Sequence, residues 1–352
     1  MIIKIKLVCL LSVSLLLISS CESKKKQANI PNRIDVPDIK LNLEFIRFEK
    51  LIFDQQTPFD STQIHTFRLT YGKFFDLWCV KLAGITPASR DPLSDAVIAT
   101  NLNQYRSDKY IRLVYADCDK KFSDISNLKS SFTESFKRYH LLFSGKNIPK
   151  IVTYISPFTS NVMAMDSVLG IGLHFYLGAD YKYYPSLQLP QYMVRKFREE
   201  YILTDALKGW IDSEYTNDSL HRSFLNNLIY QGKILYALDL LTPDTDDTIK
   251  IGFSEKQLTW AIQNESEIWG FFIEHQLLYN NNPKTYMKFI NDGNGTSGFP
   301  KDAPAQLGVY IGWQIVRSFM HQHPEIKLPQ LFSIQDAQLL LSQSNYRPAK
   351  NS

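Results

Sequence analysis

The segment PQYMVRKFREEYILTDALKGW, residues 190–210, marks the place where the pattern of this sequence changes. Its first residue, Pro190, suits the first position of a helix, because the N–H that proline lacks would have no partner there. Short strand-like segments come before it, and longer segments with helical spacing of apolar residues come after it. Strands first and helices afterwards predict an α+β fold, with a mixed sheet in the N-terminal half packed with a mainly helical C-terminal half.

The N-terminal half contains the predicted strands. Residues 41–53, LNLEFIRFEKLIF, begin with alternating apolar and polar side chains, which favours a strand. Residues 128–143 place apolar side chains at three- and four-residue spacing, which predicts an amphipathic helix. We also expect a helix at residues 62–85 and strands at residues 109–117, 149–156, 161–166 and 168–178, the last two joined by a short turn.

The C-terminal half shows helix signals. Ser254 with Gln257 has the spacing of a capping box, and Asn264 with Glu267 repeats it. Gly308 and Gly312 stand four residues apart on one helix face and permit close approach of another helix. Further helices are expected at residues 190–210, 218–241, 303–323 and 334–344.

The first residues are typical of an export signal. Lys4 and Lys6 precede an apolar run that is too short to cross a bilayer, which requires about 20 apolar residues. The following Ile-Ser-Ser-Cys, ending at Cys21, resembles the lipoprotein box of bacteria, in which the cysteine receives lipid and becomes the mature N-terminus. The alternative is an ordinary secretory signal in which Cys21 is incidental.

The lipoprotein interpretation divides the chain into three parts. Residues 1–20 are a signal peptide, residues 21–36 a lipidated tether, and residues 37–348 a single α+β domain that is strand-rich to about residue 185 and helical afterwards. A membrane partner through the lipid on Cys21 is expected, with the domain in the cell envelope, in the periplasm.

Composition argues against a nucleic-acid binder and leaves open whether two cysteines form a disulfide. Without the signal segment the chain has 37 basic and 35 acidic side chains, whereas nucleic-acid binders usually have a strong basic excess. No nucleic-acid partner is therefore expected. Cys79 and Cys118 could form a disulfide in an oxidising compartment or remain two buried thiols.

Catalytic motifs are missing from the sequence. No two histidines have the i, i+4 spacing of a zinc helix, so we interpret the histidines as structural. No nucleophile elbow or phosphate-binding glycine motif occurs. Glu265 and Glu267 fall in the first turn of a helix, where capping is favoured over acid–base chemistry. We expect no catalytic residue, metal, cofactor or small-molecule substrate, and no enzymatic activity.

Two charged residues stand out in the mostly apolar segment 218–241. Lys233 and Asp239 require partners there, because charged side chains are rarely buried alone. They could form an internal ion pair or line a groove.

Four separated stretches resemble the GldB-type gliding motility lipoproteins of the Bacteroidota. The resemblance implies a role in gliding motility and in type IX secretion of surface adhesins, with other envelope proteins as partners and no established catalytic activity. The stretches are VLGIGLHFYLG (168–178), LIYQGKILYALDLLTPD (228–244), IGFSEKQLTWAIQNESEIWGFFIEHQLLY (251–279) and GVYIGWQIVRSFM (308–320).

A fainter resemblance is to a zinc metallopeptidase core, which implies a degenerate zincin-like fold. In such enzymes one helix carries His-Glu-x-x-His and a later helix supplies a glutamate ligand. Here Glu265 or Glu267 could stand in the glutamate position, but both histidines are missing. A groove with Tyr230 and Lys233 would remain and could bind a peptide segment. The alternative function is a cell-envelope hydrolase with an unrecognised site.

Overall fold

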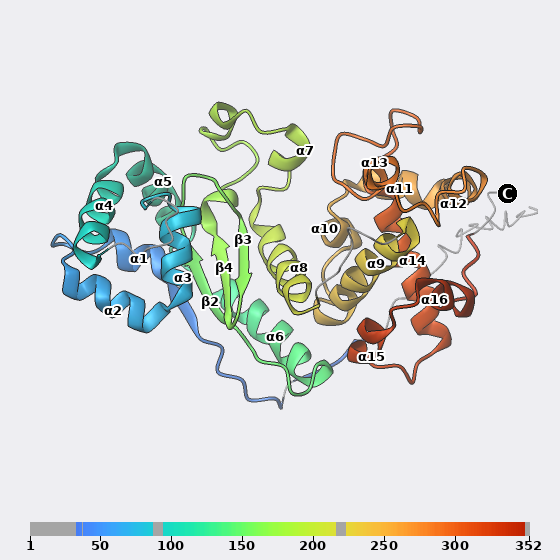
Figure 1. Cartoon of the computed structure of the whole chain (residues 1–352), viewed down its shortest axis with the longest axis horizontal. Coiled ribbons are helices and arrows are strands. Elements are labelled where there is room, and N and C mark those ends of the chain that lie inside the picture. The colour runs from blue at the N-terminus through green and yellow to red at the C-terminus, as the bar shows by residue number, and fades with distance from the viewer. Residues whose placement is uncertain (1–32, 37, 87–93, 216–222, 349–352) are drawn as a thin grey trace, which may run out of the picture.

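A four-stranded mixed sheet separates two groups of helices (Figure 1). The computed structural model describes residues 33–36, 38–86, 94–215 and 223–348, so Cys21 and most of the predicted tether lie outside the described residues. The strand order is β1-β2-β4-β3, with β1, β2 and β4 parallel and β3 antiparallel to β4. The strands are β1 (Phe45–Arg47), β2 (Lys150–Tyr154), β3 (Val162–Met165) and β4 (Val168–Gly172).

The central strands are buried on both faces. In β2 every residue after Lys150 is buried, and β4 is buried from Leu169 onward. A strand covered on both faces is expected to be an apolar run without polar alternation, and the sequences KIVTY and VLGIG fit. The predictions of strands at 149–156 and 161–166 are confirmed. The strand predicted at 168–178 ends at Gly172 and continues as a 3₁₀ turn, η2 (Leu173–Phe175).

Helices α1–α5 gather on one side of the sheet, and α6 lies apart from them, towards the C-terminal helices (Figure 1). The helices predicted at 62–85 and 128–143 are confirmed, the first as two helices and a π-helical turn. The elements are α1 (Phe48–Phe53), α2 (Ser61–Tyr71), α3 (Lys73–Leu77), η1 (Trp78–Leu82), α4 (Asp95–Ser107), α5 (Lys109–Lys121) and α6 (Ser126–Leu142).

The strand predicted at residues 109–117 is wrong, because this segment is the first part of helix α5. The carboxylate of Asp108 accepts hydrogen bonds from the backbone N–H groups of Tyr110 and Ile111 and starts the helix. Val114 and Cys118, four residues apart, are buried on one face. The N-cap and this buried face outweigh the preference of Ile, Val and Tyr for strands.

The strand predicted at residues 41–53 is confirmed only at β1. The chain turns into helix α1 at Phe48, because Phe48 and Ile52 lie on one helix face and are both fully buried. Phe48 packs edge-to-face on Phe74 and Trp78, with ring centroids 5.3 and 5.1 Å apart. Packing in this aromatic cluster therefore favours helix α1 over a longer strand.

The segment 190–210 is helical but interrupted. It forms α7 (Gln191–Val194), a 3₁₀ turn η4 (Glu199–Tyr201) and then α8 (Ile202–Glu214). Between them the carbonyl of Phe197 accepts a hydrogen bond from Gly178 N–H, and its ring packs on Phe175 and Tyr184, with centroids 5.1 and 5.0 Å apart. A continuous helix through residues 190–210 could not make these contacts of Phe197. α8 then packs against β3 and β4.

The C-terminal helices surround α9 (Phe224–Leu241), which is buried on nearly all sides. A helix that is apolar all round belongs in the interior of a protein, and α9 packs most extensively against α14 (Figure 1). The other helices are α10 (Asp247–Ile251), α11 (Glu255–Gln263), α12 (Glu265–Glu274), α13 (Pro283–Tyr286), α14 (Leu307–Gln322), α15 (Leu328–Ser333) and α16 (Ala337–Gln343).

One of the two predicted caps forms. Ser254 and Gln257 make the reciprocal bonds of a capping box at the start of α11. The cap predicted at Asn264 with Glu267 is wrong, because the Asn264 amide donates instead to the carbonyl of Trp260, at the end of α11, 2.7 Å away. Because the connection between α11 and α12 is short, Asn264 is both the C-cap residue of α11 and the N-cap residue of α12.

The α+β prediction is confirmed, with all described strands before residue 173. Helices α1–α6 also precede residue 150, so the N-terminal half has more helix than its sequence pattern indicated. Cys79 and Cys118 are separate buried thiols. Within the described ranges, no helix combines the length and apolar character needed to cross a bilayer.

Candidate functional site

Helices α9 and α14 cross at unusually close range, through glycines on both. A Cβ atom added to Gly312 would lie 1.8 Å from the carbonyl oxygen of Leu228, and one added to Gly232 would lie 2.2 Å from that of Gly312. A Cβ at Gly308 would meet the ring of Phe224 at 2.8 Å. The predicted close approach at Gly308 and Gly312 is confirmed. Sequence reasoning missed Gly232, although it stands alone in an apolar helix.

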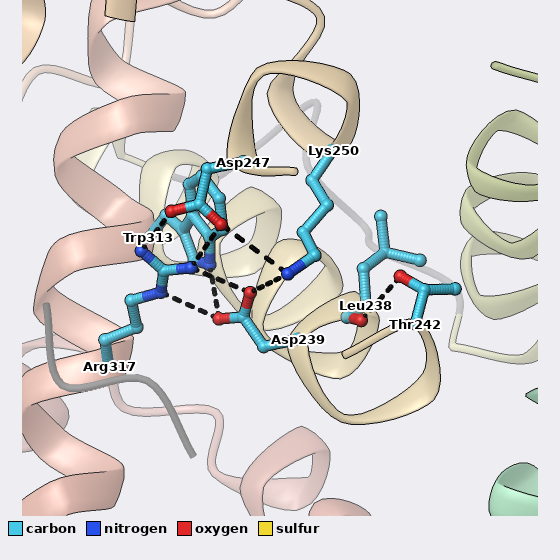
Figure 2. A network of polar contacts seen from close by, with 7 residues as sticks. All are labelled: Leu238, Asp239, Thr242, Asp247, Lys250, Trp313 and Arg317. Carbon is cyan, nitrogen blue, oxygen red and sulfur yellow. Dashed lines mark hydrogen bonds and ion pairs between the residues drawn. The ribbon is translucent and has the colours of Figure 1, made fainter. Parts of the chain in front are cut away.

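A buried network of charges lies beside this crossing (Figure 2). The Asp239 carboxylate on α9 accepts hydrogen bonds from Arg317 Nε at 2.7 Å, Arg317 Nη2 at 2.8 Å, Trp313 Nε1 at 2.9 Å and Lys250 Nζ at 3.0 Å. The guanidinium also donates to both carboxylate oxygens of Asp247, at 2.9 Å each. Two cationic and two anionic side chains thus contact one another, and their bonds join α9, α10 and α14.

The network is internally neutral, and its members are almost fully buried except Asp247, whose side chain is 24% exposed. The exposed fractions of Asp239, Lys250 and Arg317 are 1%, 2% and 2%. Burial by itself lowers the pKa of Arg317, but its bonds and attraction to Asp239, and then to Asp247, outweigh burial and raise the pKa above the ordinary value. The guanidinium carbon also lies 3.7 Å from the centre of the Trp313 ring. Asp239 is therefore committed to structural contacts.

Lys233 and Asp239 do not pair with each other. Six residues apart on one helix, they point to different sides, and the ammonium of Lys233 donates to the carbonyl of Ile334 at 2.6 Å. Sequence reasoning did not find the partners of Asp239. Arg317 could have been recognised, because it is also a charged residue in a mostly apolar segment.

Tyr230 and Lys233 line one pocket. The pocket has a volume of about 310 Å³ and lies between the end of α8, α9 and the α15–α16 connection. The Tyr230 hydroxyl donates to Asp212 Oδ1 at 2.7 Å, and burial followed by this bond raises the pKa of Tyr230. The polar residues of this Tyr230 pocket are Glu214, Tyr215, Asn226, Tyr230, Lys233 and Gln335.

Glu265 and Glu267 do not line that pocket. Both fall in the first turn of α12, as predicted. The carboxylate of Glu265 accepts hydrogen bonds from the hydroxyls of Tyr310 at 2.8 Å and Tyr346 at 3.0 Å. Glu265 thereby joins α12 to α14 and to the segment after α16, a structural role that the capping interpretation did not include. The four predicted groove residues therefore occupy two separate places.

No group of three or more His, Cys, Asp or Glu side chains in the described parts of the chain is arranged to hold a metal ion. His174, from the predicted structural histidines, is fully buried, with Nε2 3.1 Å from the hydroxyl of Ser156.

Comparison with known proteins identifies the family. No curated relative and no solved structure was found to match the chain. The family model described as gliding motility protein GldB matches residues 29–348, which includes α9, α14 and both sides of their glycine crossing. The chain therefore belongs to the GldB family of gliding motility lipoproteins.

Proposed function

We propose that this gliding motility protein acts without catalysis, as a lipid-anchored envelope protein required for motility and for type IX secretion of surface adhesins. The observation that carries the proposal is the use of Asp239, Arg317 and Glu265 within the fold. Each lies in a stretch that resembles the family, and each binds side chains of another helix. The stretches that resemble the family therefore contain residues that hold the C-terminal helices together.

The Tyr230 pocket is the proposed contact site for a peptide segment of an envelope partner. Its phenol and amide side chains, from Tyr230, Asn226 and Gln335, suit the N–H and C=O groups of a peptide. α9, which supplies most of one wall, is held rigidly against α14 by the glycine crossing. A rigid wall lowers the entropy cost of binding.

Complementation of a deletion strain tests the non-catalytic role. We expect deletion to abolish gliding and impair adhesin delivery, and the variant Glu265→Gln/Glu267→Gln to restore both. The exchange at Glu265 weakens charge-assisted bonds from two tyrosines and should cost about 1–3 kcal/mol of stability, while Glu267→Gln alone serves as the matched control. Lost motility with a folded, abundant variant would assign these residues to a working site.

The alternative, an envelope hydrolase, makes a different prediction for the purified protein. A hydrolase should cleave peptides, and a zinc peptidase should also contain stoichiometric metal. We expect neither peptide cleavage nor bound zinc. Cleavage that disappears in the double glutamate variant would support the hydrolase.

Lipidation is tested at Cys21. Mass spectrometry of the N-terminal peptide should show an acylated cysteine at this position, and Cys21→Ala should leave the preceding apolar segment uncut or poorly processed. A soluble form with unmodified Cys21 at its N-terminus contradicts the anchor.

A further inference from the structure

A groove runs along the outer edge of the sheet, between helix α6 and the segment that leads into β1. Its volume is about 560 Å³, and residues 41–45, Lys129 and Thr133 line it. In Figure 1 the segment that leads into β1 (blue) lies at the lower rim of the molecule. Exposure alternates from Leu41 to Phe45, as in an extended chain. We call this site the β1 groove, with an extended backbone as one wall and a helix as the other.

The backbone wall of the β1 groove has an open hydrogen-bonding edge. β1 stands at one end of the strand order, next to β2. The N–H of Ile151 in β2 donates to the carbonyl of Glu44 at 2.9 Å. Because successive residues of a strand direct their backbone groups to opposite edges, those of Leu43 and Phe45 point away from β2. Within the described ranges, no backbone bond involves Leu43. An open edge of this kind can pair with another strand.

The helix wall supplies a positive charge. The ammonium of Lys129 lies 5.6 Å from the centre of the Phe45 ring, and the ring of Phe45 packs on Phe132 of α6. Among the carboxylates that the structure describes, none forms an ion pair with Lys129. The neighbouring acid on α6, Glu134, is bound to Lys137 at 2.8 Å. The charge of Lys129 is therefore available to a ligand in the groove.

The acid of the backbone wall, Glu44, is engaged on the opposite face of the sheet. Its carboxylate forms an ion pair with Lys150 at 3.0 Å. Its charge also contributes, after burial, to the raised pKa of Tyr71 on α2, which packs on the side away from α6. Side chains of adjacent strand residues point to opposite faces, so Glu44 and Phe45 are separated by the sheet. The face of the groove towards α6 thus keeps an excess positive charge.

We propose that the β1 groove binds an extended segment of another protein, added antiparallel to β1 and carrying a carboxylate side chain opposite Phe45. In this pairing Leu43 and Phe45 each exchange two backbone hydrogen bonds with the residue opposite. The side chain opposite Phe45 lies on the same face and reaches Lys129, while those opposite Leu43 and Leu41 are apolar. From N- to C-terminus the segment has the pattern Glu-x-Val-x-Val. This site goes beyond the proposed function and does not depend on it.

Charge disfavours two other occupants of the groove. A second copy paired through β1 across a two-fold axis would bring both α6 helices, and both Lys129 side chains, to one face of the joined sheet, where like charges repel. The chain's own predicted tether contains Lys24, Lys25 and Lys26, which have the same sign as Lys129. An acidic strand from a partner complements the groove.

Fluorescence anisotropy with labelled peptides and the full-length lipoprotein in detergent tests the site. The acetylated and amidated peptide Thr-Glu-Thr-Val-Thr-Val-Thr should bind at least about 10-fold more tightly than the same peptide with lysine in place of glutamate. It should also bind about 10-fold more tightly than a version N-methylated at the first valine, which cannot donate to the carbonyl of Leu43. Hydrogen exchange should slow at residues 41–47 when the peptide binds.

Two variants separate the charge from the backbone bonds. Lys129→Met keeps the apolar stem beside Phe45 and should abolish the preference for glutamate over lysine, whereas Lys120→Met, an exposed position of α5, should leave it unchanged. Leu43→Pro removes the outward N–H and keeps the bond between Ile151 and Glu44, so binding should weaken about 10-fold without a change in the unfolding transition.

The N-methylated peptide keeps the test independent of how Leu43→Pro folds. Equal affinity of the methylated and unmethylated peptides, an unchanged preference for glutamate in Lys129→Met, or no binding of the acidic peptide would each overturn the proposal. Slowed exchange around the Tyr230 pocket in place of residues 41–47 would overturn it as well, because the peptide would then occupy the other site.

Discussion

At the scale of single residues, burial decides the chemistry of His174. The ring lies between the aromatic rings of Phe158 and Phe175, with centroids 4.9 and 4.8 Å away. Burial lowers its pKa from 6.5 to about 3, although a backbone hydrogen bond opposes the shift. The imidazole is therefore neutral in the folded protein at any physiological pH, which makes it a structural residue and a source of acid sensitivity.

His174 predicts a loss of stability in acid. Its pKa is lower in the folded protein than in the unfolded chain, so the unfolded chain binds the extra proton between pH 6.5 and about 3. The contribution to stability is complete above pH 6.5 and declines as the pH falls, by about 2 kcal/mol at pH 5. Urea unfolding between pH 7 and 5 measures this slope.

The variant His174→Gln should flatten that slope, whatever its effect on stability at pH 7. His140→Gln, at an exposed position of α6, is the matched control and should leave the slope unchanged. An identical pH slope in wild type and His174→Gln would show that His174 does not titrate in this range.

At the scale of elements, the pairing of α9 with α14 organises the C-terminal half. The glycines remove side chains where the two backbones meet, and the buried network joins the same helices a turn or two further along. Both features depend on contacts between segments far apart in sequence, since Asp239 and Arg317 are separated by 78 residues. The two helices and α10 should therefore lose their structure together.

Gly312→Ala tests the crossing. The added methyl would overlap the carbonyl of Leu228, so the helices must separate, at a cost of about 1–3 kcal/mol or more. Gly270→Ala on α12 is the control, because a Cβ there meets nothing within 4 Å and should stabilise the helix by about 0.4–1 kcal/mol. Equal stability of Gly312→Ala and wild type in denaturant would refute the close packing.

Arg317→Met tests the network. Removing the guanidinium leaves Asp239 buried with less compensation, and we expect unfolding free energy to fall by about 3–5 kcal/mol. Arg198→Met breaks an exposed pair with Glu200 and should cost about 0–1 kcal/mol. Adding Asp239→Leu to Arg317→Met should recover part of the loss, and a double mutant no more stable than Arg317→Met would argue against an uncompensated charge.

At the scale of the whole molecule, the sheet and the C-terminal helices share a continuous core. α8 contacts both β3 and β4, and a Cβ at Gly209 would lie 2.7 Å from the side chain of Val162. Asn161 and Tyr176 from the sheet region bond with Asp205 on α8. These contacts indicate that residues before and after the 185 region stabilise one another.

Fragments divided at about residue 185 test the single domain. Neither residues 37–185 nor residues 186–348 should unfold cooperatively alone, because each would expose the apolar surface at α8 and the sheet. Calorimetry and circular dichroism of both fragments measure this. A sharp, independent transition in either fragment would divide the protein into two domains.

Features that depend on neighbouring residues could be predicted from the sequence alone. The apolar runs of β2 and β4, the capping box at Ser254 and the apolar character of α9 are all local patterns, and the structure confirms each. The α+β class follows from their order along the chain. Tyr230 and Lys233 were named as groove residues from the fainter resemblance to a metallopeptidase core, and both line the Tyr230 pocket.

Which distant residues contact one another depends on the packing of the whole chain. It converted residues 109–117 from an expected strand to a helix, interrupted the segment 190–210 at Phe197, and separated Glu265 from the Tyr230 pocket. It also selected Arg317, and not Lys233, as the partner of Asp239. The reason is physical: buried charges and rings are stabilised by whatever packing brings beside them, and sequence spacing does not specify those partners.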